Sequence, residues 1–288
     1  MKISYFSILL IFLTSTNTFS KCVCERENDP NTPINVAIID LIRGNNATAI
    51  NLLKETNNPN ISNACGAGIL LISSIYNDEE VTRIFLKAGA DPNMASLNGL
   101  TPIENAAQWS SNEVLSMLID AGANPNPKIL DCSKNSFYNT PLLLAAINNN
   151  IEGVKILLKS GADYNHRNIN GLNVFHILVS SNNTETLNDI IESISGKKLK
   201  NSIANGIIFQ TSATNGKEDQ LEFFLSKSFD PNFSIDDSAP YNTPLLIAAL
   251  NKNIASVKIL IKYGANIDYT NKKGYNLKRI IKEKILMS

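Results

Sequence analysis

Two histidines, four cysteines and a few adjacent carboxylates are the residues of this 288-residue chain whose types could support chemistry. Hydrolases, metalloproteases and nucleotide-binding enzymes need such groups at fixed spacings, and the sequence contains no G-x-S-x-G, H-E-x-x-H or Walker pattern. The stretch "CGAG" at 65–68 lacks the third glycine of a dinucleotide-binding loop. Glu79-Glu80 and Asp236-Asp237 fall in polar turns or at helix starts, where solvated carboxylates are common. We therefore predict no enzyme activity and no catalytic, cofactor-binding or metal-binding residue.

The cysteines, Cys22, Cys24, Cys65 and Cys132, avoid the apolar positions that the helix patterns below assign to the core. A zinc site would need a second close pair or a histidine at a suitable spacing, and Cys22-x-Cys24 has neither. In an oxidising compartment four cysteines can form three full pairings, and the spacing does not choose among them. We predict at least one disulfide bond, with reduced thiols and a zinc site as the alternatives.

The N-terminus, "MKISYFSILLIFLTSTNTFSKC", has the three-part order of an export signal. Lys2 precedes an apolar run over 5–13, and a polar stretch of small residues ends at Ser20. The run is shorter than the roughly 20 residues that a membrane-spanning helix needs. The sequence predicts a signal peptide at 1–20, an N-terminal segment at 21–34 and a secreted or periplasmic protein. An uncleaved anchor or a buried first helix is the alternative.

Charge and composition restrict the partners. The chain has 26 basic and 26 acidic residues, a net charge of zero, so no overall field attracts nucleic acid or an anionic membrane. Hydrophobic residues make up 43% and charged residues 18%, which is typical of a packed globular chain. We predict a monomer with no membrane span and no nucleic-acid partner.

Two long stretches of the chain are nearly the same. "YNTPLLLAAINNNIEGVKILLKSGADYN" occupies 138–165 and "YNTPLLIAALNKNIASVKILIKYGANID" occupies 241–268. The same pattern starts near 68, 101, 173 and 207, more weakly near 35, and in shortened form near 276. A recurring period of this length is typical of stacked repeats, each of which buries its apolar face against the next.

Each unit of the pattern predicts two helices. Thr-Pro starts the first helix, because the hydroxyl caps backbone N–H groups and proline is pre-set for the first turn. Small residues such as Ala145 and Ala248 allow neighbouring helices to approach closely. An apolar triplet marks the core of the second helix, and a glycine in the left-handed conformation ends it. The triplets lie at 84–86, 117–119, 156–158, 223–225 and 259–261, and the glycines are Gly89, Gly122, Gly161 and Gly264.

This pattern resembles the ankyrin repeat family. The resemblance rests on T-P-L or T-P-I at 101–103, 140–142 and 243–245, on G-A-D or G-A-N after each second helix, and on the turn asparagines Asn93, Asn126, Asn165 and Asn232. It implies an all-α ankyrin-repeat solenoid over 35–288, with about seven helix-pair repeats and a C-terminal capping half-repeat. The fifth repeat, which carries "SGKKLKNS", departs from the pattern, so a smooth superhelix is not expected over 190–210.

The resemblance also implies a function, the binding of another protein through a concave surface of finger turns and first helices. The candidate partner-binding residues at the ends of the first helices are Tyr76, Gln108, Trp109, Asn148, Ser181, Asn215 and Asn251. Asn98 and Asn168 are candidates at the finger tips. The alternatives are an enzyme with a site in the 127–139 insert and the irregular fifth repeat, or a structural envelope protein.

Three further features have both a structural and a functional interpretation. His176 matches the histidine of the family's T-P-L-H, which ties adjacent turns together, and His166 lies in a finger loop that is expected to be exposed. The last helix carries Lys278, Arg279, Lys282 and Lys284. A charged outer face keeps a capping half-repeat soluble, and the other interpretation is a contact with an acidic partner or anionic lipid.

Overall fold

The computed structural model describes residues 29–97, 99–128, 139–181, 184–194, 196–214, 216–234 and 241–285. They fall into two compact units, one within 1–171 and the other within 172–288. Apart from one isolated bridge between Ser62 and Gly68, the regular structure of these residues is helical. The predicted all-α class is confirmed.

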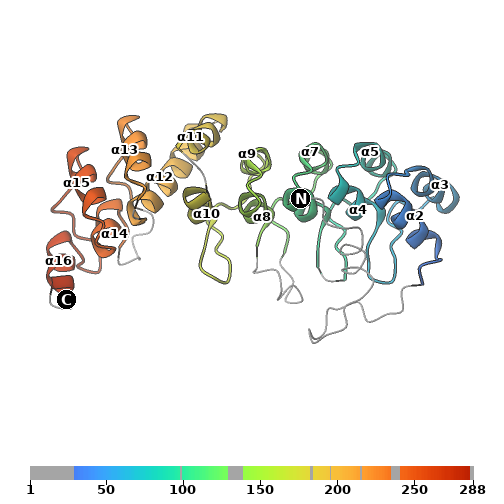
Figure 1. The fold of residues 1–288 in the computed structure, drawn as a ribbon, viewed down its shortest axis with the longest axis horizontal. Helices are drawn as coiled ribbons and strands as arrows, with labels where there is room; N and C mark the ends of the chain where they lie inside the picture. Colours follow the sequence, from blue (N-terminus) through green and yellow to red (C-terminus); the bar gives the residue numbers. More distant parts are fainter. Residues whose placement is uncertain are drawn as a thin grey trace. The chain divides into compact units, whose positions relative to one another are not determined.

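The first unit contains four helix pairs. They are α2 (Pro33–Ile42) with α3 (Ala47–Thr56), α4 (Ile69–Tyr76) with α5 (Glu79–Lys87), α6 (Pro102–Trp109) with α7 (Asn112–Asp120), and α8 (Pro141–Ile147) with α9 (Ile151–Lys159). The first helices pack on one another in one row and the second helices pack in another (Figure 1).

The second unit contains three pairs and a last helix. They are α10 (Val174–Ser181) with α11 (Thr184–Ser193), α12 (Lys197–Ala213) with α13 (Glu218–Ser226), α14 (Pro244–Leu250) with α15 (Ile254–Lys262), and α16 (Leu277–Ile285). In this unit α10, α12, α14 and α16 pack in sequence, and α11, α13 and α15 form the second row (Figure 1). Each unit therefore stacks repeats of the same design.

The helix signals of the sequence are realised in the structure. Thr140 and Thr243 cap α8 and α14, where each hydroxyl accepts a hydrogen bond from the backbone N–H three residues later. The central residues of the triplets are completely buried, namely Phe85, Leu118, Leu157, Phe224 and Leu260. The glycines after the second helices have φ between 86° and 92°, namely Gly89, Gly122, Gly161 and Gly264. Glycine adopts the left-handed conformation without a steric penalty, which explains why the pattern repeats it.

Asparagines in two turns of the first unit, Asn93 and Asn126, link successive repeats. Asn93 Nδ2 donates to Gly122 O at 3.1 Å, and Asn93 Oδ1 accepts from Asn124 N at 2.7 Å. Asn126 makes the same two bonds, to Gly161 O and from Asp163 N. One side chain therefore satisfies a carbonyl at the end of a second helix and an N–H of the following turn.

The first repeat begins earlier than the predicted residue 35. Thr32 is the N-cap of α2, its Oγ1 accepts from Asn35 N at 3.4 Å, and Pro33 is the first helical residue. The Thr-Pro pair therefore starts the first helix of this repeat, as it does in later repeats. The period is simply three residues longer between the first two units.

The sixth repeat begins ten residues before its predicted start near 207, at Lys197. Gly196, with φ of 90°, is the N-cap of a 17-residue α12, and "KKLKNS" forms its first turns. The residues that form a finger in other repeats are helical at this place. No proline or turn pair interrupts them, so the helix extends backwards from the repeat.

Candidate protein-binding surface

The candidate surface lies at the C-terminal ends of the first helices in the first unit. α4 and α6 each end in an aromatic residue, Tyr76 and Trp109, and both side chains are half-buried. The next residues, Asn77 and Ser110, cap these helices in the left-handed conformation, with φ of 54° and 61°. That conformation turns the chain sharply into the second helix and leaves the aromatic residue at the edge of the turn.

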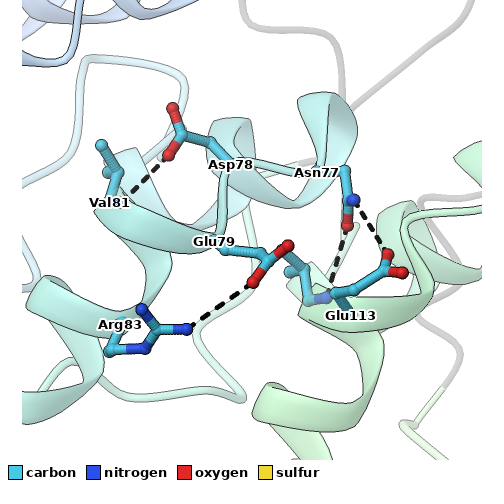
Figure 2. A network of polar contacts seen from close by, with 7 residues as sticks. Asn77, Asp78, Glu79, Val81, Arg83 and Glu113 are labelled. Carbon is cyan, nitrogen blue, oxygen red and sulfur yellow. Dashed lines mark hydrogen bonds and ion pairs between the residues drawn. The ribbon is translucent and has the colours of Figure 1, made fainter.

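Hydrogen bonds between repeats hold these turns in place. Asn77 Nδ2 donates to Glu113 Oε2 at 2.9 Å, and Asn77 Oδ1 accepts from Val114 N at 3.4 Å. Figure 2 shows Asn77 reaching across to Glu113, beside the cap that Asp78 makes to Val81 N at 3.0 Å. Glu79 and Arg83 form an exposed ion pair at 3.6 Å on the same helix.

The next turn is braced in the same way. Asn150 caps α9 by accepting from Gly153 N at 2.9 Å, and its Nδ2 donates to Asn112 Oδ1 of the preceding repeat at 2.8 Å. A longer contact, 3.4 Å, joins the same Nδ2 to Ala107 O. The helix ends that carry the candidate residues are therefore tied to their neighbours by side-chain amides, of which that of Asn150 is buried.

The first turn of α6 holds a buried carboxylate. Glu104 Oε2 accepts from both the backbone N–H and the hydroxyl of Thr101, at 2.8 and 2.6 Å. Desolvation by burial raises the pKa of Glu104, and the bonds from Thr101 act in the opposite direction. This carboxylate caps the helix that presents Trp109.

The remaining candidates differ in what their side chains do. Gln108 is half-buried beside Trp109. Asn148 is exposed and donates only to Leu144 O of its own helix, at 2.8 Å. Ser181 and Asn251 of the second unit are exposed, and Asn251 Nδ2 donates to Ala213 O at 2.8 Å. Asn98 and Asn215 lie outside the described residues.

The finger-tip candidate Asn168 is not an exposed residue. Only 7% of its surface is accessible, and its Nδ2 donates to Asn139 Oδ1 at 3.1 Å. Its Oδ1 accepts from Asn170 N at 3.0 Å, so the side chain shapes its own loop. A contact between Asn168 and a partner stays a prediction, and this burial leaves little of the residue accessible to one.

Three exposed apolar residues were missed from the sequence. Leu97 and Ile169 occupy the finger tips and each exposes about half of its surface. Ile147, the last residue of α8, is 49% exposed. The available signals were an apolar residue within the polar turns "SLNG" and "NING", and the register of Ile147 with Ile75 and Gln108.

The structure places one histidine at the start of a helix and the other in a loop. His176 lies in the first turn of α10, where its Nδ1 is 2.6 Å from Asn173 Oδ1 and 3.3 Å from Asn173 N. His166 is half-buried in its loop. Within the described ranges, no group of three or more His, Cys, Asp or Glu side chains could hold a metal ion. In the same ranges, no helix is both long and apolar enough to cross a bilayer.

Cys65 is the one cysteine within the described residues. It is buried, with 7% of its surface accessible. Its backbone N–H donates to Asn63 Oδ1 at 3.0 Å, and its carbonyl accepts from Leu97 N at 3.0 Å. Cys22, Cys24 and Cys132 lie outside the described residues.

Comparison with known proteins agrees with this architecture. The family model for ankyrin repeats in three copies matches residues 34–129 and 175–273, and the model for ankyrin repeats in many copies matches 142–191. These matches cover most of the chain. The chain belongs to the ankyrin repeat family.

Individual relatives are distant and cover about half of the chain. A putative ankyrin repeat protein of Rickettsia felis is 28% identical over 138 residues, 48% of this chain and 33% of that protein. A putative ankyrin repeat protein of fowlpox virus is 32% identical over 131 residues, 46% of this chain and 68% of that protein. The human transient receptor potential cation channel subfamily A member 1 is 29% identical over 143 residues, 49% of this chain and 12% of the channel. The matched parts are thus a third or less of the first and last of these proteins.

Among solved structures, the human ASB11 ankyrin repeat domain aligns with 77% of this chain and 97% of its own. The TM-score is 0.46 and the sequence identity is 16%.

Proposed function

We propose that this chain is an exported, non-catalytic scaffold that binds another protein through the helix-end surface of its first unit. We define this surface by Tyr76, Gln108, Trp109, Ile147 and Asn148. The ankyrin repeats mark the chain as a protein–protein interaction scaffold. Export and the lack of catalysis are the finer parts of the proposal, and the N-terminal pattern and the absence of catalytic motifs support them.

The observation that carries the proposal is the position of Trp109 beside a braced turn. Trp109 is the single tryptophan of the chain, and it is half-buried at the end of α6. Partly exposed aromatic residues are common anchors of binding energy, because they bury a large area at a small cost in side-chain entropy. The bonds from Asn77 and Asn150 hold the neighbouring turns, so a partner would meet a surface that is already ordered.

The residues of this surface also indicate what the partner offers. Tyr76, Trp109 and Ile147 end three successive first helices, α4, α6 and α8, which pack side by side. The corresponding last residues in the second unit are Ser181, Ala213 and Leu250, none of which is aromatic. We infer that the partner contributes apolar side chains to the first unit.

The test compares two variants of the mature protein in quantitative affinity capture from its native compartment, with mass spectrometry. Burial of each aromatic side chain contributes about 1.5–3 kcal/mol, so Tyr76→Ala with Trp109→Ala should reduce retention of the partner more than tenfold. Phe223→Ala is the matched control, because Phe223 is also a half-buried aromatic residue but lies on α13. Circular dichroism and thermal melting must show that both variants are folded.

Two results would overturn the proposal. The first is equal retention of the same proteins by the wild type and the Tyr76/Trp109 variant, with both folded. The second is a measurable turnover that His176→Ala or His166→Ala abolishes without unfolding the protein.

A further inference from the structure

The stack of second helices in the second unit ends with one face of α15 uncovered. Leu221 and Leu225 of α13 are completely or almost completely buried, in a helix that packs against α15. Their counterparts one repeat later are Val257 and Ile261. Leu225 is 3% exposed, whereas Ile261 is 44% exposed and Val257 is half-buried.

The difference arises because no second helix follows α15 within 241–285. α16 packs against α14 in the row of first helices, at the red end of the chain in Figure 1. Val257 and Ile261 are spaced four residues apart, so they lie on one side of α15. That side is therefore an intact helix-packing face that the described chain does not cover.

The end face of α16 carries charged residues where the preceding first helix carries apolar ones. Where α14 carries Leu245 and Leu246, both buried, α16 carries Lys278 and Arg279, both exposed. α15 has kept its apolar residues at the equivalent end. If this end of the described chain were adapted only for solubility, a polar residue would be expected at position 261, as at positions 278 and 279.

Charge identifies the chemistry that can approach this face. Residues 251–288 contain nine Lys or Arg and two Asp or Glu, a net charge of +7, so the rest of the neutral chain carries −7. A second copy that met this end with its own equivalent end would be repelled. An occupant must combine an apolar stripe for Val257 and Ile261 with acidic groups for the surrounding cations.

The packing of α15 on α13 supplies the geometry. Lys262 Nζ of α15 pairs with Glu222 Oε1 of α13 at 2.6 Å, across the two second helices. Lys258 occupies the position in α15 that is equivalent to the position of Glu222 in α13. A helix that packed on α15 in the same register would therefore bring the equivalent of Lys262 to Lys258, and that residue must be acidic for the contact to be attractive.

We propose that the Val257/Ile261 face of α15 is a docking site for an acidic amphipathic helix of a partner protein, which continues the row of second helices. Helix-in-groove recognition of this kind uses apolar anchors at i and i+4 spacing. This site is separate from the helix-end surface of the first unit and does not depend on it.

The probe is a stapled, fluorescent peptide with the α15 sequence Asn253–Gly264 that carries Lys258→Glu and Lys262→Glu. The matched peptide keeps both lysines. We expect the acidic peptide to bind the full chain in a fluorescence anisotropy titration, and the lysine peptide to bind at least fivefold more weakly.

Substitutions in the protein locate the contact. Ile261→Ala should weaken binding of the acidic peptide about tenfold, since two or three buried methylene-sized groups are lost. Ile267→Ala is the control, because Ile267 is 49% exposed, much as Ile261 is, but lies beyond the end of α15 at Lys262, and its loss should change binding less than twofold. Lys258→Glu should reverse the preference between the two peptides.

The remaining outcomes contradict the proposal. They are no binding of the acidic peptide up to about 1 mM, where the binding free energy is only about 4 kcal/mol, or equal effects of Ile267→Ala and Ile261→Ala. Ile261-dependent binding to phosphatidylserine vesicles without peptide binding would assign the face to a membrane. Ile261-dependent dimers in light scattering would assign it to a second copy. The Tyr76/Trp109 variant should bind the peptide normally, so failure of one surface does not imply failure of the other.

Discussion

Phe175 of α10 lies directly against the backbone of Gly206 in the middle of α12. A Cβ atom on Gly206 would stand 2.3 Å from Phe175 Cε2, well inside van der Waals contact. Gly206 is helical and has an ordinary negative φ, so close approach explains its presence, and backbone strain does not. The contact joins the fifth and sixth repeats, where the finger is missing, through a ring packed on a bare helix surface.

We predict that Gly206→Ala lowers the free energy of unfolding of the second unit. Overpacking in a core costs about 1–3 kcal/mol. Alanine gains about 1 kcal/mol in helix propensity over glycine, so the cost of overpacking exceeds this gain at the upper end of its range. Urea unfolding measures this loss of unfolding free energy. Phe175→Leu should remove most of the clash, so the double variant Phe175→Leu with Gly206→Ala should lose less than the sum of the single losses. Additive losses would contradict a direct contact.

The three consecutive asparagines at 148–150 provide a matched pair of variants. Asn150→Ala removes the cap of α9 and the bridge to Asn112, and should cost about 1–2 kcal/mol of stability. Asn148→Ala removes one bond within an exposed helix end, and should cost less than about 0.5 kcal/mol. Equal melting temperatures for the two variants would show that Asn150 does not brace the repeats.

The N-terminal pattern predicts that the mature protein begins at or near Lys21. Protein purified from its native source should give this N-terminus by Edman degradation or mass spectrometry. Replacing the apolar residues Leu9 and Leu10 with Arg should retain the protein, uncleaved, inside the cell, whereas replacing both with Ile should leave export intact. An intact Met1 on cytosolic wild-type protein would contradict the proposal of export.

The cysteines predict a redox-dependent stability. At least one pair should be oxidised in exported protein, so a thiol count on denatured, unreduced protein should find two reactive thiols or none. Removal of a native disulfide costs about 2–5 kcal/mol in small secreted domains, so Cys65→Ser should lower the melting temperature in oxidised protein. The same substitution should change the melting temperature of fully reduced protein far less. Four reactive thiols in native protein would contradict the prediction.

The repeat design could be predicted from sequence because its signals are local. Thr140-Pro141 starts a helix and Gly161 ends one through properties of those residues alone, and the structure agrees. The start of α12 at Lys197 could not be predicted, because no cap or turn residue marks it and the helix extends by default. The burial of Asn168 depends on Asn139, 29 residues away, to which it donates a hydrogen bond.

The exposure of an apolar helix residue also depends on whether another helix packs beside it, and the sequence of the helix does not specify this. Leu225 and Ile261 are similar apolar residues at the same position of successive repeats. α15 packs on the helix that carries Leu225, whereas no further second helix follows α15 within 241–285, and Leu225 is 3% and Ile261 44% exposed.

The buried carboxylate of Glu104 predicts how stability depends on pH. Burial raises the pKa of Glu104 in the folded protein above its ordinary value of 4.5, so the folded state binds the proton more tightly than the unfolded state does. The contribution of this group is therefore most favourable below 4.5, and it declines as the pH rises from 4.5 through the raised pKa. Above that pKa it stays constant, at its least favourable.

Glu104→Gln tests this sign. Glutamine keeps an oxygen that accepts from the Thr101 backbone and hydroxyl, and it carries no charge that burial would penalise. We expect the variant to be at least as stable as the wild type at pH 7, and to lose that advantage as the pH falls through the raised pKa toward 4.5. Glu104→Ala is the control, because it removes the cap bonds and should destabilise the protein at both pH values. If urea unfolding instead showed that Glu104→Gln is less stable at pH 7 and equally stable at low pH, the ionised carboxylate would be the favoured form, and the hydrogen bonds from Thr101 would outweigh its desolvation.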